Sequence, residues 1–133
     1  MNHNIAETLP NIAAIYPDRN GLVCKKGKGY RSWTFIEIDS LTNWFARNLS
    51  DRGVTKGDRV ILMVTPSVEF ITLTFALFKI GAVIILIDPG MGYKNLLKCI
   101  GKVKPDGQYQ IIWRSPDNIN GDPWYGETGR SSW

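Results

Sequence analysis

The residues that could act as a nucleophile, a base or a metal ligand are few and far apart in this sequence. The chain of 133 residues has one histidine, His3, and two cysteines, Cys24 and Cys99. A Ser-His-Asp or Cys-His site needs a histidine held beside its nucleophile, but His3 lies at a terminus that we expect to fray. Zinc sites need ligands at short spacings, which these residues lack. We therefore expect no metal site, and two thiols without a disulfide framework indicate a reducing, cytoplasmic location.

Lysines beside glycines are the next candidates, because such loops can bind phosphate. Residues 25–29 read Lys-Lys-Gly-Lys-Gly. They lack the strand-loop-helix setting and the spacing of a P-loop, so we interpret them as the exposed tip of a hairpin. A second group of lysines falls along a helix predicted over residues 93–103, and we interpret it as a solvated face: Lys94, Lys98, Lys102 and Lys104.

The charge and hydropathy patterns exclude two further classes of protein. The net charge of +4 comes from 16 Lys+Arg and 12 Asp+Glu and is divided between the two parts of the chain. Nucleic-acid binders gather basic residues on one stripe or helix, so we expect no nucleic-acid partner. Residues 70–87 form an apolar run with Lys79 as its only charge. Because Gly81 and a change to β-branched residues interrupt this run, we predict a helix followed by a strand, and no transmembrane span.

The first third of the chain predicts a helix, a hairpin and a second helix. Apolar residues at three- and four-residue steps predict a helix over residues 5–16. Two short apolar runs, at 22–24 and 30–33, predict a β-hairpin. Thr34 and Glu37 have the spacing of a capping box and predict the start of the second helix. Its buried stripe is expected to contain Ile38, Leu41, Trp44, Phe45 and Leu49.

A βαβ unit is predicted in the middle of the chain. Its strands are residues 60–64 and 82–87, and the helix between them begins at a Thr65 cap followed by Pro66. Both strands are apolar throughout and the connection is long, so we expect parallel strands buried on both faces. The predicted fold class is α/β: a partial layered sheet with a βαβ unit, preceded by a β-hairpin and a capped helix.

Four segments, in this order, resemble the adenylate-forming ligases, the superfamily of acyl-CoA synthetases and AMP-dependent ligases. Residues 32–38 are similar to the family's first core motif, and residues 52–60 to the Gly-Val/Asp-Arg segment that follows. Residues 65–70 are similar to its Asn-Ser-x-Glu-Phe helix start. Residues 78–89 resemble the second core motif, a strand that ends in Asp-Pro. The segment after this strand is similar to the long-chain acyl branch, which includes the β-lactone synthetases of olefin biosynthesis.

The resemblance implies a two-step reaction of a fatty or other carboxylic acid. The carboxylate attacks the α-phosphate of ATP with Mg²⁺ to give an acyl-adenylate, and coenzyme A or the substrate's own hydroxyl then takes the acyl group. The family's phosphate loop, nucleotide-binding motifs and catalytic lysine do not occur in these residues. We therefore assign no catalytic, cofactor-binding or metal-binding residue. Asp88 and Glu69 match turn and helix-start positions, for which we expect structural roles.

The chain divides into two parts. Residues 1–107 match the N-terminal part of an AMP-binding domain, whereas residues 108–133 form an irregular, turn-rich tail in which only 109–113 has the pattern of a strand. A change of reading frame after Gly107 is one hypothesis for this break. We interpret the chain as an N-terminal fragment of an AMP-forming acyl ligase, incomplete relative to the family's large N-terminal domain. It is expected to be inactive alone, and its open sheet edge favours marginal stability or self-association. The alternative is a small stand-alone interaction or regulatory module derived from the first βαβ portion.

Overall fold

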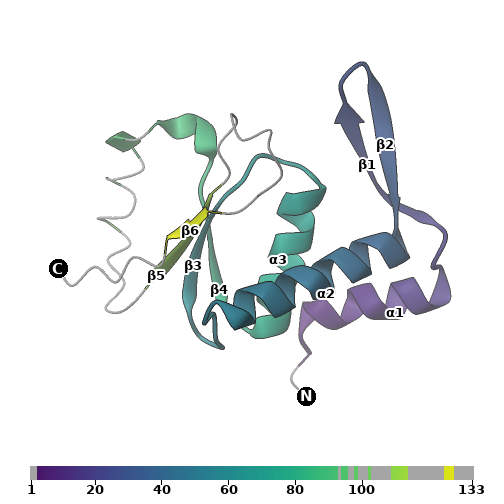
Figure 1. The fold of residues 1–133 in the computed structure, drawn as a ribbon, viewed down its shortest axis with the longest axis horizontal. Helices are drawn as coiled ribbons and strands as arrows, with labels where there is room; N and C mark the ends of the chain where they lie inside the picture. The colour runs from purple at the N-terminus through teal and green to yellow at the C-terminus, as the bar shows by residue number, and fades with distance from the viewer. Residues whose placement is uncertain are drawn as a thin grey trace. The chain divides into compact units, whose positions relative to one another are not determined.

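The computed structural model describes residues 3–92, 94, 95, 98, 102, 109–113 and 125–127 (Figure 1). The chain forms two compact units, each assembled from separated stretches of sequence. The first unit comprises Met1–Lys56 and Pro66–Ala82, and the second comprises Gly57–Thr65 and Val83–Trp133. Together they contain the helices, the hairpin and the parallel strands of the predicted α/β class.

The first unit is built on three helices. A short 3-10 turn, η1 (Ile5–Glu7), leads into α1 (Thr8–Ile15), and the longer helices are α2 (Phe35–Asp51) and α3 (Val68–Ile80). Helix α2 packs against both α1 and α3. Asn4 holds the start of this unit against α3, because its side-chain amide Nδ2 donates a hydrogen bond to the carbonyl of Phe78 at 2.7 Å. The predicted helix over residues 5–16 is confirmed, with its first turn in the tighter 3-10 form.

The helix ends follow the sequence signals, with one exception. The amide of Thr34 donates to Glu37 Oε2 at 2.8 Å and the amide of Glu37 donates to Thr34 Oγ1 at 3.3 Å, which confirms the capping box. Helix α3 ends at Gly81, whose φ of 84° is the left-handed conformation that glycine adopts without strain. The prediction that Thr65 caps α3 is wrong. Ser67 is the cap, and its hydroxyl accepts the amide of Phe70 at 3.2 Å.

The buried stripe of α2 differs from the predicted one at Trp44, and Leu41 and Leu49 of the predicted stripe are half-buried. Ile38 and Phe45 are buried as expected, but the Trp44 side chain is 50% exposed. Thr42, which was not in the predicted stripe, is completely buried. Positions 38, 42 and 45 are spaced by four and three residues and therefore lie on one face of the helix. The Trp44 ring instead lies edge-on against Phe45, with their centroids 5.0 Å apart.

Strands β1 (Asn20–Lys26) and β2 (Gly29–Thr34) form the predicted hairpin. The expected five-residue loop over 25–29 is wrong, because the pair Lys26–Gly29 closes a two-residue turn. Gly27, the first residue of that turn, has a φ of 60°, as a type II′ turn requires at this position. The strands therefore extend further than their apolar residues indicated.

The second unit contains a four-stranded sheet in the order β4-β3-β5-β6. Strand β3 (Arg59–Met63) pairs in parallel with β4 (Val83–Leu86) and with β5 (Tyr109–Trp113). This confirms the parallel strands of the βαβ unit and the strand predicted at 109–113. Strand β6 (Tyr125–Glu127) pairs antiparallel with β5 and was not predicted, because three residues are too short to show a period.

The two strands of the βαβ unit differ in burial. Val60, Ile61 and Leu62 of β3 are buried, as expected for a central strand. In β4, Val83 is 51% and Leu86 is 59% exposed, so the expectation that this strand is buried on both faces is wrong. Strand β4 lies at the edge of the described sheet, so its side chains have neighbours from β3 on one side only, whereas those of β3 lie between two strands.

The apolar run over residues 70–87 contains a helix followed by a strand, as predicted. It comprises most of α3, the left-handed Gly81 and β4. Within the described parts of the chain, no helix has the length and apolar character needed to cross a membrane. In the helix predicted over 93–103, Lys94, Asn95, Lys98 and Lys102 are helical. Its expected inward residues lie outside the described residues: Leu96, Leu97 and Ile100.

Candidate functional site at the carboxyl ends of the parallel strands

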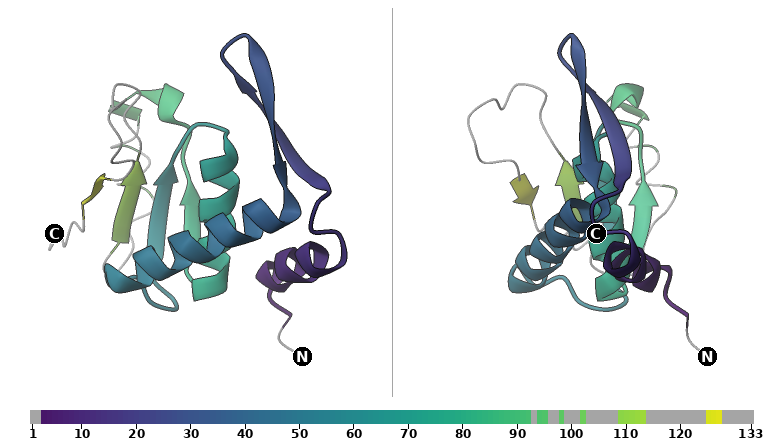
Figure 2. Two further views of the ribbon diagram at one scale, coloured as in Figure 1. Left: turned by 45° about the vertical axis from the view of Figure 1, so that its right-hand side comes forward. Right: turned by 90° about the vertical axis from the view of Figure 1, so that its right-hand side faces the viewer.

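The topology of the second unit points to one end of its sheet. From β3 the chain runs to β4 on one side and then to β5 on the other side, so the direction of the connections reverses at β3. In open α/β sheets, ligands bind beyond the carboxyl ends of the strands at such a reversal. Figure 2 shows the three parallel arrowheads at the same end. The candidate site therefore lies beyond Met63 of β3 and Trp113 of β5.

The described residues at this end form turns. After β4, the Asp88 carboxylate accepts the amide of Gly90 at 2.8 Å and so caps a short 3-10 turn, η2 (Pro89–Met91). This is the structural role that the sequence predicted for Asp88. Glu69, the other acid considered, lies in the first turn of α3 in the first unit, where a negative charge is favourable to the helix dipole.

The structure does not bring the candidate nucleophiles and ligands together. His3 is exposed near the N-terminus and Cys24 is a half-buried free thiol in β1, whereas Cys99 lies outside the described residues. No three or more His, Cys, Asp or Glu side chains in the described part of the chain lie close enough to share a metal ion. The described residues at the strand ends thus supply one carboxylate, that of Asp88, which already accepts a hydrogen bond from a backbone amide.

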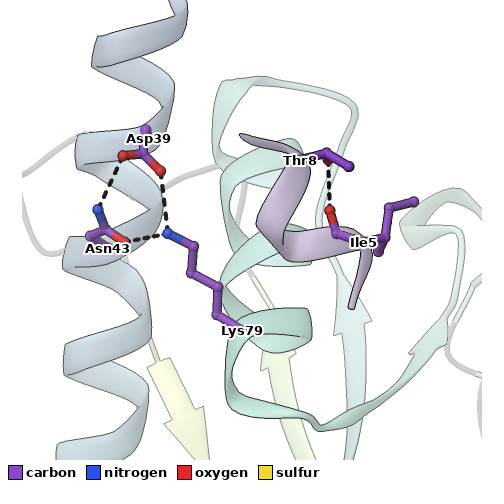
Figure 3. A network of polar contacts seen from close by, with 5 residues as sticks. All are labelled: Ile5, Thr8, Asp39, Asn43 and Lys79. Carbon is purple, nitrogen blue, oxygen red and sulfur yellow. Dashed lines mark hydrogen bonds and ion pairs between the residues drawn. The ribbon is translucent and has the colours of Figure 1, made fainter. Parts of the chain in front are cut away.

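A polar cluster in the first unit accounts for Lys79, the single charge of the apolar run. Its Nζ lies 3.2 Å from Asp39 Oδ1 and also donates a hydrogen bond to the side-chain oxygen Oδ1 of Asn43. The side-chain amide Nδ2 of Asn43 in turn donates to Asp39 Oδ2 at 3.4 Å. Figure 3 shows this closed triangle joining α2 to α3, beside the Thr8–Ile5 hydrogen bond that begins α1. Because its members satisfy one another, we assign the cluster a structural role. A lone lysine in an apolar helix was the sequence signal for it, and the sequence did not reveal its partners.

The lysine-rich segments are exposed. Lys94, Lys98 and Lys102 are exposed on the helical segment, which confirms a solvated face there, and Lys104 lies outside the described residues. The lysines of the hairpin are also exposed, and a strand follows their turn where a P-loop would continue into a helix. The hairpin is therefore not a phosphate loop of that type.

Comparison with known proteins identifies the family. A family model described as AMP-binding enzyme matches residues 9–108, three quarters of the chain. The chain belongs to this family. An olefin beta-lactone synthetase of Xanthomonas campestris pv. campestris is 37% identical over 109 residues, which cover 77% of this chain and 20% of that protein.

Solved structures of other proteins share the fold. The Mycobacterium tuberculosis fatty acyl CoA synthetase matches 73% of this chain and 19% of its own, with 29% identity and a TM-score of 0.66. The N-terminal subdomain of Klebsiella oxytoca NpsA matches 92% of this chain and 29% of its own, with a TM-score of 0.73. At 22% identity, the second match shows the fold alone. These findings confirm the resemblance seen in the sequence, and the chain spans about a fifth of the length of the two olefin beta-lactone synthetases that it matches.

Proposed function

We propose that this chain is the N-terminal part of an ATP-dependent acyl ligase and that its described residues serve as scaffold, not as catalytic groups. The observation that carries the proposal is the family match over residues 9–108. In the proposed parent reaction, a carboxylate oxygen attacks the α-phosphorus of ATP and pyrophosphate leaves. A second nucleophile then attacks the acyl carbonyl and AMP leaves. The names of the Xanthomonas and Mycobacterium relatives support a fatty or related carboxylic acid as substrate.

The names of the similar proteins suggest two candidates for the second nucleophile of the parent reaction. A fatty acyl CoA synthetase transfers its acyl group to the thiol of coenzyme A, and a β-lactone synthetase closes a ring through the substrate's hydroxyl. Two olefin beta-lactone synthetases are 35–37% identical to this chain over 109–111 residues, and two curated acyl-CoA ligases are 31–32% identical over 85–88 residues. Lactone closure is therefore the first reaction to test in the parent protein, with transfer to coenzyme A as the comparison.

The described residues do not fit ATP with Mg²⁺. Such a site needs carboxylates for the metal and amides or cations for the phosphates. The described strand ends offer one carboxylate, Asp88, and no three His, Cys, Asp or Glu side chains of the described residues lie together. We therefore derive no step of the reaction from these residues.

The proposal predicts that the 133-residue chain does not form acyl-adenylates alone. The test is ATP–pyrophosphate exchange by the purified chain with medium- and long-chain fatty acids and Mg²⁺. The full-length Xanthomonas synthetase serves as the positive control. We expect no exchange that depends on the fatty acid. Turnover by the chain, removed by heat inactivation, would overturn the scaffold assignment.

We also propose that residues 108–133 arise from a change of reading frame. The motif pattern stops near residue 107, and the family match ends at residue 108. The residues of β5 still form a parallel strand with β3, because Tyr-Gln-Ile-Ile-Trp has suitable composition. Genomic sequencing after the codon for Gly107 tests this proposal. We expect a Ser/Thr/Gly-rich segment ending in Pro-Lys-Gly in another frame, and its absence from every frame would refute the idea.

A stand-alone interaction module is the second candidate function. The observation that favours it is the exposed row of Lys94, Lys98 and Lys102, at four-residue spacing and with no acidic residue between Asp88 and Asp106. Sedimentation combined with urea unfolding separates the two candidates. A monomer with one cooperative transition supports the module. Concentration-dependent association supports a fragment with an open edge at β4. In either case we propose a cytoplasmic location, for which the free thiol of Cys24 is the support.

A further inference from the structure

The β1–β2 hairpin concentrates positive charge. Between Arg19 and Ile36 the sequence has five basic residues and no acidic one: Arg19, Lys25, Lys26, Lys28 and Arg31. Figures 1 and 2 show the hairpin extending away from α1 and α2, with its turn at the far end. Lys25, Lys26 and Lys28, which we call the tip lysines, are exposed there. None of the three forms an ion pair with a described residue.

The register of the hairpin separates its side chains into two faces, because directly paired residues lie on the same side. On one face, Arg31 is paired with Cys24, and its guanidinium stacks 3.7 Å from the ring centre of Trp33. Cys24 and Trp33 on this face are half-buried. Lys26 also belongs to this face, because successive residues of a strand point to opposite sides. The face is therefore partly covered by its own side chains.

The other face is open and carries apolar groups. It pairs Val23 with Ser32 and Lys25 with Tyr30, and we call these four residues the open hairpin face. Val23 is 56% exposed and Tyr30 is 77% exposed. Lysines beside a strand are a common protection against edge-to-edge aggregation. That role explains the lysines, but it does not explain an aliphatic and an aromatic side chain left exposed beside them.

We propose that the open hairpin face and the tip lysines bind the surface of a bilayer that contains anionic phospholipid. The charge of the tip complements a negative leaflet, whose attraction acts on each lysine near the surface. Tyrosine has an apolar ring and a polar hydroxyl, which suits the headgroup region. The Tyr30 ring could also stack on a base, but Val23 favours lipid, because an aliphatic side chain gains from burial among acyl chains and offers no stacking surface.

The test is sedimentation of the 133-residue chain with vesicles of phosphatidylcholine alone or mixed with phosphatidylglycerol. We expect binding to the mixed vesicles only, with an affinity that falls as salt rises. The triple variant K25Q/K26Q/K28Q should bind about 100-fold more weakly, from about fivefold for each lysine. The matched control is K94Q/K98Q/K102Q, which removes the same charge from exposed positions elsewhere and should retain most of the binding.

The apolar part of the proposal has its own variant. Tyr30→Ser should weaken binding severalfold without changing the salt dependence, because it removes apolar contact and no charge. Circular dichroism verifies that each variant keeps its fold. Equal losses in the two triple variants, or no binding to the mixed vesicles, would overturn the proposal. Tighter hairpin-dependent binding to a single-stranded oligonucleotide than to the vesicles would also overturn it.

Discussion

Gly21 is a position where one methyl group should have a large effect on stability. A Cβ built there would lie 2.7 Å from two ring carbons of Phe35 and 2.9 Å from Cδ1 of Ile38. Non-bonded carbon atoms settle at about 3.5–4.0 Å, so all three contacts are too short by roughly an ångström. The residue sits where the register of the hairpin shifts, between the pairs Asn20–Thr34 and Leu22–Trp33. Ile38 is buried on α2, so its side chain cannot move aside into solvent.

The magnitude follows from a matched pair of variants, Gly21→Ala and Gly29→Ala. Both glycines lie in the hairpin strands, but a Cβ at Gly29 meets no atom within 4 Å. Both changes reduce the entropy of the unfolded chain, an effect of about 0.4–1 kcal/mol that the comparison cancels. Overpacking of this kind costs about 1–3 kcal/mol. We therefore expect Gly21→Ala to be less stable than Gly29→Ala by about 2 kcal/mol, which lowers the melting temperature by roughly 10 °C.

Thermal and urea unfolding, followed by far-ultraviolet circular dichroism, measure this difference. Hydrogen exchange of the amides in the first turn of α2 is the second measurement, because Phe35 and Ile38 lie in that turn. Gly21→Ala should increase exchange there, and Gly29→Ala should not. If the two variants unfold at the same midpoint and exchange alike, the close packing of the hairpin base on α2 is refuted.

Three further experiments test the packing and capping of the helices. Thr42→Val should stabilise the chain by about 1 kcal/mol, because the buried Thr42 hydroxyl makes no hydrogen bond with the described residues. Thr72→Val is its control and should destabilise by a similar amount, since that buried hydroxyl donates to a backbone carbonyl at 2.8 Å. A double-mutant cycle of Asp39→Asn and Lys79→Gln, measured by urea unfolding, should give a coupling of up to about 1 kcal/mol that decreases in high salt; zero coupling would exclude an energetic role for the ion pair. Thr34→Ala should destabilise by about 1 kcal/mol through loss of the capping box, and an unchanged unfolding midpoint would contradict that.

The helix ends could be predicted because their causes are local. The capping box of Thr34 and Glu37 depends on residues three apart, and Gly81 ends α3 because it takes a left-handed φ. The start of α3 was misplaced by two residues because Thr65 and Ser67 both have a hydroxyl suitable for capping. Ser67 is the cap because its backbone is extended, with φ −167° and ψ 176°, and its hydroxyl faces the amide of Phe70.

Burial could not be predicted as well, because it depends on which element covers a side chain. Trp44 lies on the exposed side of α2, next to the stripe that contains Thr42. Leu86 belongs to an apolar strand, but the described sheet has β3 on one side of it only. The partners of Lys79 come from α2, 36 and 40 residues away in sequence. Spacing along the chain contains no information about contacts of that range.

The four segments that identified the family lie where the chain changes direction. They contain the cap of α2, the loop that follows α2, the cap of α3, and the path from Gly81 through β4 to the turn at Asp88. Backbone geometry restricts the residue types at such places, since a cap needs a side-chain oxygen and a left-handed φ favours glycine. These requirements do not depend on a substrate. They therefore mark the shared scaffold of the family, whereas substrate choice depends on side chains that line a pocket. This separation explains how a chain with no assigned catalytic residue can be placed in its family from its turns and helix ends.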